Sequence, residues 1–191
     1  MIIIGITGTL GAGKGTIVEY LVRTRGFLHF SVRAYISEEI KKRGMPVNRD
    51  TLTRVANELR EKNSPSFIID ELYKKALSSG RDCVIESIRT PGEVKSLKSK
   101  SRFYLFAVDA DPVLRYKRIK LTKSEPDRVT YETFLANEER EMNSADPNKQ
   151  NLHKCRKMAD FLLHNERSVE ELYQQVDTIL DTKIKKTDER K

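Results

Sequence analysis

The chain has 191 residues, of which 38% are hydrophobic and 34% are charged, a balance typical of one globular domain and not of a disordered chain. Two cysteines are too few for a disulfide framework, and the apolar N-terminal run is too short to span a bilayer, so we expect a cytoplasmic protein without a membrane segment. The net charge of +8 suits a polyanionic ligand such as a nucleotide. Because the basic residues are spread over several segments and mixed with acids, the charge pattern argues against nucleic acid as the partner.

Apolar runs alternate with amphipathic segments along the chain, which predicts βαβ units and a parallel sheet. Strands are expected at Ile2–Thr7, Phe27–Phe30, Cys83–Glu86, Phe103–Asp109 and Phe161–His164. Helices are expected at Lys14–Arg25, Val32–Arg43, Thr51–Lys62 (capped by Asp50), Pro65 to about Ser78, Pro112 to about Leu121, and from a capping box at Ser168–Glu171 to about Asp181. The polar stretch Lys123–Asn151 is expected to be a mobile, mostly helical excursion.

The run from Gly8 to Lys14 matches the phosphate-binding pattern G-x-x-x-x-G-K, directly after an expected strand and at the start of an expected helix. Glycines let the backbone wrap so that N–H groups converge on phosphate oxygens, and the helix N-terminus adds partial positive charge. Lys14 is expected to reach the β- and γ-phosphates and to stabilise charge during catalysis. The loop residues expected to bind ATP are Gly8, Gly11, Ala12, Gly13, Lys14, Gly15 and Thr16.

Gly15 follows the lysine where most such loops have Ser or Thr, and the hydroxyl comes one residue later, on Thr16. This ending resembles the loop of nucleoside monophosphate kinases such as adenylate kinase. The resemblance implies that Mg²⁺ is held largely through phosphates and water, with Thr16 close to it. It argues against signalling GTPases, whose N-K-x-D and D-x-x-G motifs are also missing from this sequence.

Two further candidate residues come at and just after the strand expected at Cys83–Glu86. In monophosphate kinases the matching strand ends with an acid, and an arginine soon after it grips the acceptor phosphate. The resemblance therefore implies that Arg89 binds the acceptor phosphate and acts in catalysis. It implies that Glu86 lies at the acceptor site and organises Mg²⁺ through water. The alternatives are a surface ion pair for Arg89 and, for Glu86, a role in satisfying Arg89.

Arginines that are candidates for a lid follow the strand expected at Phe103–Asp109. In the family that the loop resembles, the next helix leads into a lid whose arginines close over the transferring phosphoryl group. The resemblance implies catalytic roles for Arg115, Arg118 and Arg128, and Arg140 is a further candidate. Phosphoryl transfer needs positioned positive charge and exclusion of water, and a charged lid supplies both. A solvated helix face is the alternative for each arginine alone.

The stretch Ala159–Leu172 resembles the end of dephospho-CoA kinases and related archaeal P-loop proteins, in which the loop after the last strand lies near the adenine. Asn165 is therefore implied to face the base of ATP, with a plain turn residue as the alternative. Dephospho-CoA kinases also have an acid after the second strand, which activates a sugar hydroxyl. The corresponding segment here, His29–Tyr35, has no acid, which favours an acceptor phosphate that is already ionised. Ser31 and Arg33 are candidates to hold that phosphate.

The sequence thus predicts an α/β chain with a three-layer P-loop fold: a five-stranded parallel sheet in the order 2-3-1-4-5, helices on both faces and a helical lid. One kinase domain is expected over residues 1–181, with an acceptor-binding insertion at about 31–67, a lid at about 122–151 and a charged tail at 182–191. The expected function is transfer of the ATP γ-phosphoryl group, with Mg²⁺, to a nucleotide-like acceptor, foremost a nucleoside or deoxynucleoside monophosphate. The alternatives are a dephospho-CoA kinase-like activity, a regulatory ATP-binding module without catalysis, and a nucleic-acid-binding ATPase. The chain is expected to be a monomer or a homodimer.

Overall fold

A computed structural model describes residues 1–121 and 129–184. In these residues five parallel strands form one sheet, in the order β2-β3-β1-β4-β5. The strands are β1 (Ile3–Thr7), β2 (Leu28–Ser31), β3 (Cys83–Glu86), β4 (Phe103–Asp109) and β5 (Phe161–His164). The expected sheet and strand order are therefore confirmed. Every residue of β1 is buried, because this strand lies in the centre of the sheet with helices over both faces.

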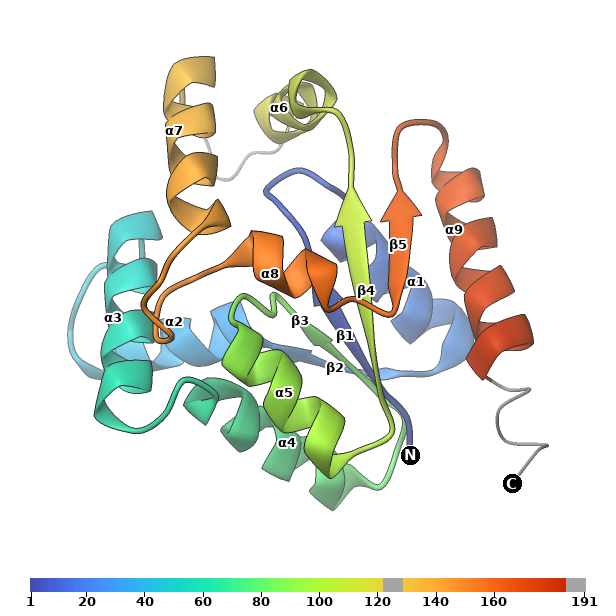
Figure 1. The fold of residues 1–191 in the computed structure, drawn as a ribbon, viewed down its shortest axis with the longest axis horizontal. Coiled ribbons are helices and arrows are strands. Elements are labelled where there is room, and N and C mark those ends of the chain that lie inside the picture. The colour runs from blue at the N-terminus through green and yellow to red at the C-terminus, as the bar shows by residue number, and fades with distance from the viewer. Residues whose placement is uncertain (122–128, 185–191) are drawn as a thin grey trace.

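Helices connect the strands (Figure 1). They are α1 (Lys14–Arg25), α2 (Val32–Lys42), α3 (Arg49–Lys62), α4 (Phe67–Ser79), α5 (Pro91–Lys100), α6 (Pro112–Leu121), α7 (Tyr131–Met142), α8 (Leu152–Lys157) and α9 (Val169–Thr178), which continues into a π-helical segment, Ile179–Ile184. None of the described helices is long and apolar enough to cross a membrane.

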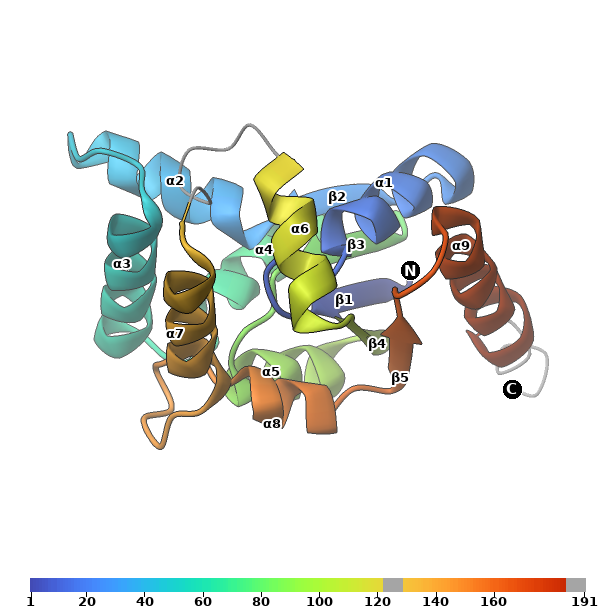
Figure 2. The same ribbon diagram turned by 90° about the horizontal axis from the view of Figure 1, so that it is seen from above.

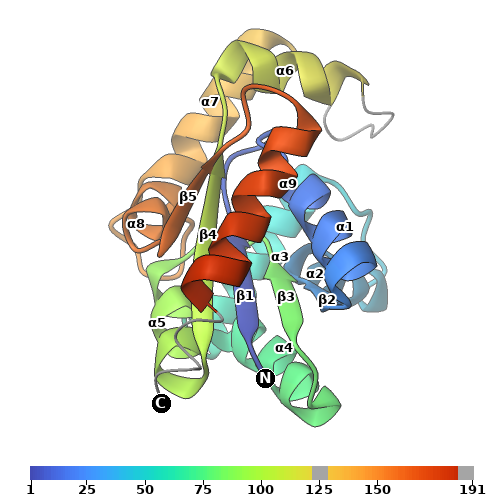
Figure 3. The ribbon, with the colours of Figure 1, turned by 90° about the vertical axis from the view of Figure 1, so that its right-hand side faces the viewer.

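Two hydrophobic cores lie on opposite faces of the sheet. Because side chains alternate along a strand, Ile4 and Ile6 of β1 point to one face and Ile3 points to the other. The first core contains residues of α1 and α9, and the second contains residues of α2, α3, α4 and α5. The views along the layers show α1 and α5 on opposite sides of the strands (Figures 2 and 3).

The carboxyl ends of the strands meet at one edge of the sheet, where open α/β sheets bind their ligands. The loop that follows β1, the segment that follows β3 and the start of α6 all lie at this edge (Figure 1). At one end of the sheet α3 and α7 lie side by side, which brings together segments that are far apart in the sequence (Figures 1 and 2).

The described helices differ from the expected ones at α3, α5 and α8. Helix α3 begins two residues early, because Asn48 and not Asp50 caps it: the Asn48 side chain accepts a hydrogen bond from the Thr51 backbone N–H at 2.9 Å. Helix α5 was not expected, although Thr90 and Glu93 form a capping box at its start. The short α8 also lies outside the expected elements. The predicted lid residue Arg128, with the rest of 122–128, lies outside the described residues, as do residues 185–191 of the tail.

Candidate functional site

The loop after β1 wraps around the side chain of the lysine that begins α1. The Lys14 Nζ donates hydrogen bonds to the carbonyl oxygens of Gly8 at 3.0 Å and Thr9 at 2.8 Å. Burial of the amine, with repulsion from Arg89, lowers the pKa of Lys14 to about 8, and attraction from Glu86 opposes that change. The amine is thus held in a place where its charge is poorly compensated, as expected of a group that binds an anion.

Three loop glycines are required by backbone geometry. Gly8, Gly11 and Gly13 have φ angles of 147°, 77° and 104°, which L side chains rarely adopt. Space is also missing: a Cβ at Gly13 would lie 2.1 Å from the Asn165 Nδ2, and one at Gly11 would lie 2.6 Å from the Arg115 carbonyl oxygen. A Cβ at Gly15 would meet nothing within 4 Å. The missing side chain at Gly15 therefore leaves open space toward the pocket and is not a requirement of packing.

This contrast gives a matched pair of substitutions. We expect Gly13→Ala to lower the free energy of unfolding by about 1–3 kcal/mol and to weaken ATP binding at least tenfold, because the new Cβ strains the loop and displaces Asn165. Gly15→Ala, inside α1, should leave stability unchanged or raise it by up to about 1 kcal/mol. Thermal melts and titration with a fluorescent ATP analogue check both. Equal melting temperatures for the two variants would contradict the loop geometry described here.

A pocket of about 490 Å³ opens from this loop toward α2 and α3. Its size lies within the range of small-molecule sites. Among the described residues, six basic side chains but only two acidic ones line it: Lys14, Arg33, Arg49, Arg60, Arg89 and Arg118, against Glu86 and Glu141. Apolar side chains of α2 and α3, Val32, Ile36, Leu52 and Ala56, form part of its wall. The lining suits a ligand that is polyanionic at one end and apolar at the other.

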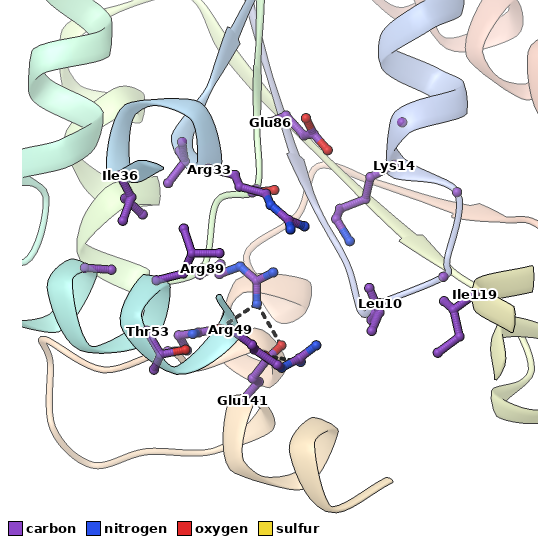
Figure 4. A pocket seen from close by; sticks show the side chains of 18 of the residues that line it. Leu10, Lys14, Arg33, Ile36, Arg49, Thr53, Glu86, Arg89, Ile119 and Glu141 are labelled. Carbon is purple, nitrogen blue, oxygen red and sulfur yellow. Dashed lines mark hydrogen bonds and ion pairs between the residues drawn. The ribbon is translucent and has the colours of Figure 1, made fainter. Parts of the chain in front are cut away.

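Lys14 points into the pocket from one side, and Arg33 and Arg89 point into it from the other (Figure 4). Among the described residues no hydrogen bond or ion pair engages the exposed Arg33 guanidinium. Glu86, at the end of β3, shares a hydrogen bond of 3.2 Å with His29 Nε2. That bond lowers the pKa of Glu86, as do Lys14 and Arg89, although burial acts in the opposite direction. Glu86 is therefore an ionised carboxylate at neutral pH.

Glu141 of α7 bridges two arginines of the pocket. Its carboxylate accepts from Arg89 at 2.7 Å and from Arg49 at 2.5 Å, and Arg89 also donates to the Gln150 side chain at 2.6 Å (Figure 4). Burial alone would raise the pKa of Glu141, but the two guanidinium groups outweigh it and lower the pKa. Two arginines from separate segments thus already hold one anionic group at the pocket wall.

Arg115 and Arg118, both expected to act in catalysis, lie in different surroundings. Arg115 is buried and bonds through its guanidinium to the carbonyl oxygens of Ala110 and Leu10 and to Glu138. It does not line the pocket, and its catalytic role stays a prediction. Arg118 lines the pocket, and its Nη1 is buried without a hydrogen-bond partner in the described chain. Burial lowers the pKa of Arg118.

Two other candidates lie against the backbone and not in the pocket wall. The Ser31 hydroxyl caps α2 by accepting from the Ala34 N–H at 3.2 Å. Asn165 is buried, and its Nδ2 donates to the Ala12 carbonyl at 3.0 Å, a contact with the loop. That Asn165 faces the base of ATP stays a prediction. Thr16 lines the pocket as expected. Arg140 pairs with Asn137 and lines a second groove, of about 510 Å³, between α3 and α7.

The sequence analysis did not name the pocket residues Arg49, Arg60, Glu141 and Gln150, although the first two lie in the expected acceptor-binding insertion and the last two in the expected lid. Each belongs to a segment whose position depends on long-range packing. A spacing pattern was present in α3. Its pocket residues follow the three- and four-residue intervals of one helix face: Arg49, Leu52, Thr53, Ala56 and Arg60. That pattern shows a shared face but does not say which partner it meets.

Comparisons with known proteins agree with this geometry. A family model described as an AAA domain matches residues 4–144. The chain is 28% identical over 183 residues to the UPF0200 protein MJ1399 of Methanocaldococcus jannaschii, covering 94% of this chain and 89% of that protein. The fold of this chain is similar to that of TT1252 from Thermus thermophilus, with a TM-score of 0.64 and 21% identity. The match covers 94% of this chain and 96% of that one. The fold is also similar to that of shikimate kinase from Bacteroides thetaiotaomicron (TM-score 0.57, 14% identity, 94% and 98%). The chain therefore has the fold of P-loop kinases.

Proposed function

The chain belongs to the AAA domain family, and from that premise we propose that it is an ATP-dependent phosphotransferase whose acceptor is a nucleoside or deoxynucleoside monophosphate. The observation that carries the proposal is the pocket lining. One cavity joins the loop built around Lys14 to a wall that carries Arg33, Arg49 and Arg89, and then to an apolar end. A triphosphate and a second phosphate need this surplus of positive charge, and a nucleoside needs the apolar wall.

Arg89 and Arg49 are proposed to hold the acceptor phosphate. Their guanidinium groups converge on one carboxylate, that of Glu141, and a phosphate offers the same kind of charge-assisted acceptor to an arginine fork. In the ligand-free protein Glu141 occupies the place of that anion. Arg33, exposed at the same pocket, is a second candidate contact for the acceptor phosphate.

Lys14 and Arg118 are proposed to stabilise the charge of the transferring group. Both line the pocket, and both have a lowered pKa because their charge is buried. Arg115 and Asn165 are proposed to keep the loop in shape, since both bond to its carbonyl oxygens. The lid at residues 122–151, with Arg128, remains a prediction of the sequence.

The described residues fit a Mg²⁺ ion held mainly by phosphates and water. They contain no cluster of three His, Cys, Asp or Glu side chains that could hold a metal ion by itself. The Thr16 hydroxyl and the ionised Glu86 carboxylate both line the pocket, and hard oxygen donors of this kind are the ones that Mg²⁺ takes. When bound, Mg²⁺ would supply positive charge that neutralises part of the charge of the phosphates.

An ionised acceptor fits the pocket better than an alcohol does. A hydroxyl acceptor needs a base that takes its proton. Among the described residues two carboxylates line the pocket: Glu86, which is bound to His29, and Glu141, which is bound to Arg49 and Arg89. Both have a lowered pKa, which makes them weak bases. A phosphate acceptor requires no base.

A coupled assay of ADP release tests the proposal across nucleoside monophosphates, deoxynucleoside monophosphates and dephospho-CoA. We expect at least one monophosphate to stimulate ADP release and dephospho-CoA to have no effect. Stimulation by dephospho-CoA alone would support the kinase activity with the other acceptor. ADP release that no acceptor changes, together with tight ATP binding, would instead support a regulatory module.

A further inference from the structure

We propose that Arg60 selects the acceptor by its base, and that the preferred acceptor is a nucleoside monophosphate whose base carries a carbonyl oxygen. This inference rests on the proposed phosphotransferase function and narrows its substrate class. It begins from a buried charge that the fold leaves incompletely satisfied.

Arg60 is buried to 99% on α3, at the inner surface of the pocket. Its Nε and Nη2 donate to one oxygen of Glu93, at 3.1 and 2.8 Å. Its Nη1 is buried and has no hydrogen-bond partner among the described residues. A buried donor without a partner is rare in native proteins, and it calls for an acceptor that the chain itself does not supply. Because Arg60 lines the pocket, a bound molecule is the natural source.

The partner of Nη1 should be neutral. Glu93 is fully buried, and its charge balances that of Arg60. The second Glu93 oxygen accepts from the backbone N–H groups of Arg89 at 2.7 Å and Thr90 at 3.0 Å, so the pair is also fixed in place. An anionic group added here would bring a net charge into a buried site that is already balanced. A carbonyl oxygen would accept the hydrogen bond at no such cost.

The surroundings fit a flat, largely apolar ring. Leu52 and Ala56 lie on the same face of α3 as Arg60, and Val32 and Ile36 of α2 line the same pocket. Arg49, one of the two arginines proposed to hold the phosphate, lies on this face about three turns before Arg60. One helix thus presents an anion-binding arginine, apolar side chains and a buried donor without a partner. A nucleoside monophosphate offers a phosphate at one end and, at the other, a flat ring that can carry a carbonyl oxygen.

The experiment compares inosine and adenosine monophosphates. The first has an exocyclic carbonyl oxygen where the second has an amino group, and the adjacent ring nitrogen carries a hydrogen only in the first. For the wild-type protein we expect kcat/KM to be about tenfold or more higher with the inosine compound. Arg60→Lys keeps a cation beside Glu93 but has no nitrogen that corresponds to Nη1, the donor without a partner. We expect this variant to fold and to discriminate less than about threefold. Arg54→Lys, an exposed change on the same helix outside this pocket, should discriminate like the wild type.

Binding measured by calorimetry without phosphoryl transfer separates this inference from the proposed function. If no transfer occurs but the inosine compound binds more tightly and Arg60→Lys removes the preference, the proposed function fails and the assignment of Arg60 stands. If transfer occurs and the two compounds are used equally, or Arg60→Lys leaves their ratio unchanged, the assignment of Arg60 is overturned. Absence of binding of either compound to the wild type overturns it as well. Thermal melts of Arg60→Lys and of the double variant Arg60→Met/Glu93→Gln, which removes both charges, control for folding.

Discussion

Lys14→Ala should reduce kcat for phosphoryl transfer by about 10²- to 10³-fold or more while the protein stays folded. The amine lies inside the loop and is the basic group placed directly between its carbonyl oxygens and the pocket. Its removal takes away positive charge at the place where the transferring phosphoryl group would carry negative charge. Steady-state rates of ADP release, with circular dichroism of the same samples, check this result. A variant that is folded and retains more than a tenth of the activity would remove Lys14 from the mechanism.

The pKa of Lys14 adds a pH dependence with a definite sign. Folding lowers this pKa from its ordinary value of 10.5 to about 8. The charged amine therefore destabilises the ligand-free fold fully below pH 8, and this penalty fades as the pH rises from 8 to 10.5. We expect the melting temperature of Lys14→Met to be no lower than that of the wild type at about pH 7. Near pH 10 the wild type should gain stability relative to this variant. ATP binding by the wild type should weaken above about pH 8, because the free amine becomes neutral.

Arg89→Ala should raise KM for the acceptor roughly thirtyfold and change KM for ATP much less. A charge-assisted hydrogen bond to a phosphate contributes about 2 kcal/mol, which corresponds to that factor. The side chain lies at the pocket wall, where its Nη1 is held by Glu141 and Gln150. Initial rates with each substrate varied in turn measure the two constants. If the variant lost ATP binding while KM for the acceptor stayed unchanged, Arg89 would be assigned to ATP binding and not to the acceptor.

Glu141→Gln is the opposing variant and should lower KM for the acceptor by about three- to tenfold. The carboxylate neutralises Arg49 and Arg89 in the ligand-free protein, so the amide leaves more positive charge for the incoming phosphate. The same kinetic measurements apply. A raised KM in this variant would mean that Glu141 holds the arginines in position and does not compete with the acceptor.

The strands and the loop were predictable because their signals are local. An apolar run of five residues, a glycine pattern and a lysine at the start of a helix specify Ile3–Lys14 almost without reference to the rest of the chain. The order of the strands follows from the P-loop kinase type that this loop indicates. By contrast, α5 lacks a strong apolar period and is marked only by the capping pair Thr90 and Glu93.

The side of the pocket proposed to bind the acceptor was less predictable because it depends on long-range packing. Glu141 comes 52 residues after Arg89 and Gln150 comes 61 after it, and only the position of α7 and the loop after it beside α3 brings them together. Arg115 and Asn165 have residue types that suit phosphate and base recognition, and both also bond to carbonyl oxygens of the loop. Their expected roles stay predictions. A polar residue near a site can bind the ligand or can position the groups that bind it. The amino-acid sequence alone does not distinguish these two roles.

The most direct test of the proposed activity is the fate of a labelled phosphoryl group. The protein is incubated with Mg²⁺, γ-³²P-labelled ATP and a nucleoside monophosphate, and the products are separated by chromatography. We predict label in the corresponding nucleoside diphosphate for the wild type and none for Lys14→Ala. Label that appears only as inorganic phosphate, at a rate that the monophosphate does not change, would contradict the account.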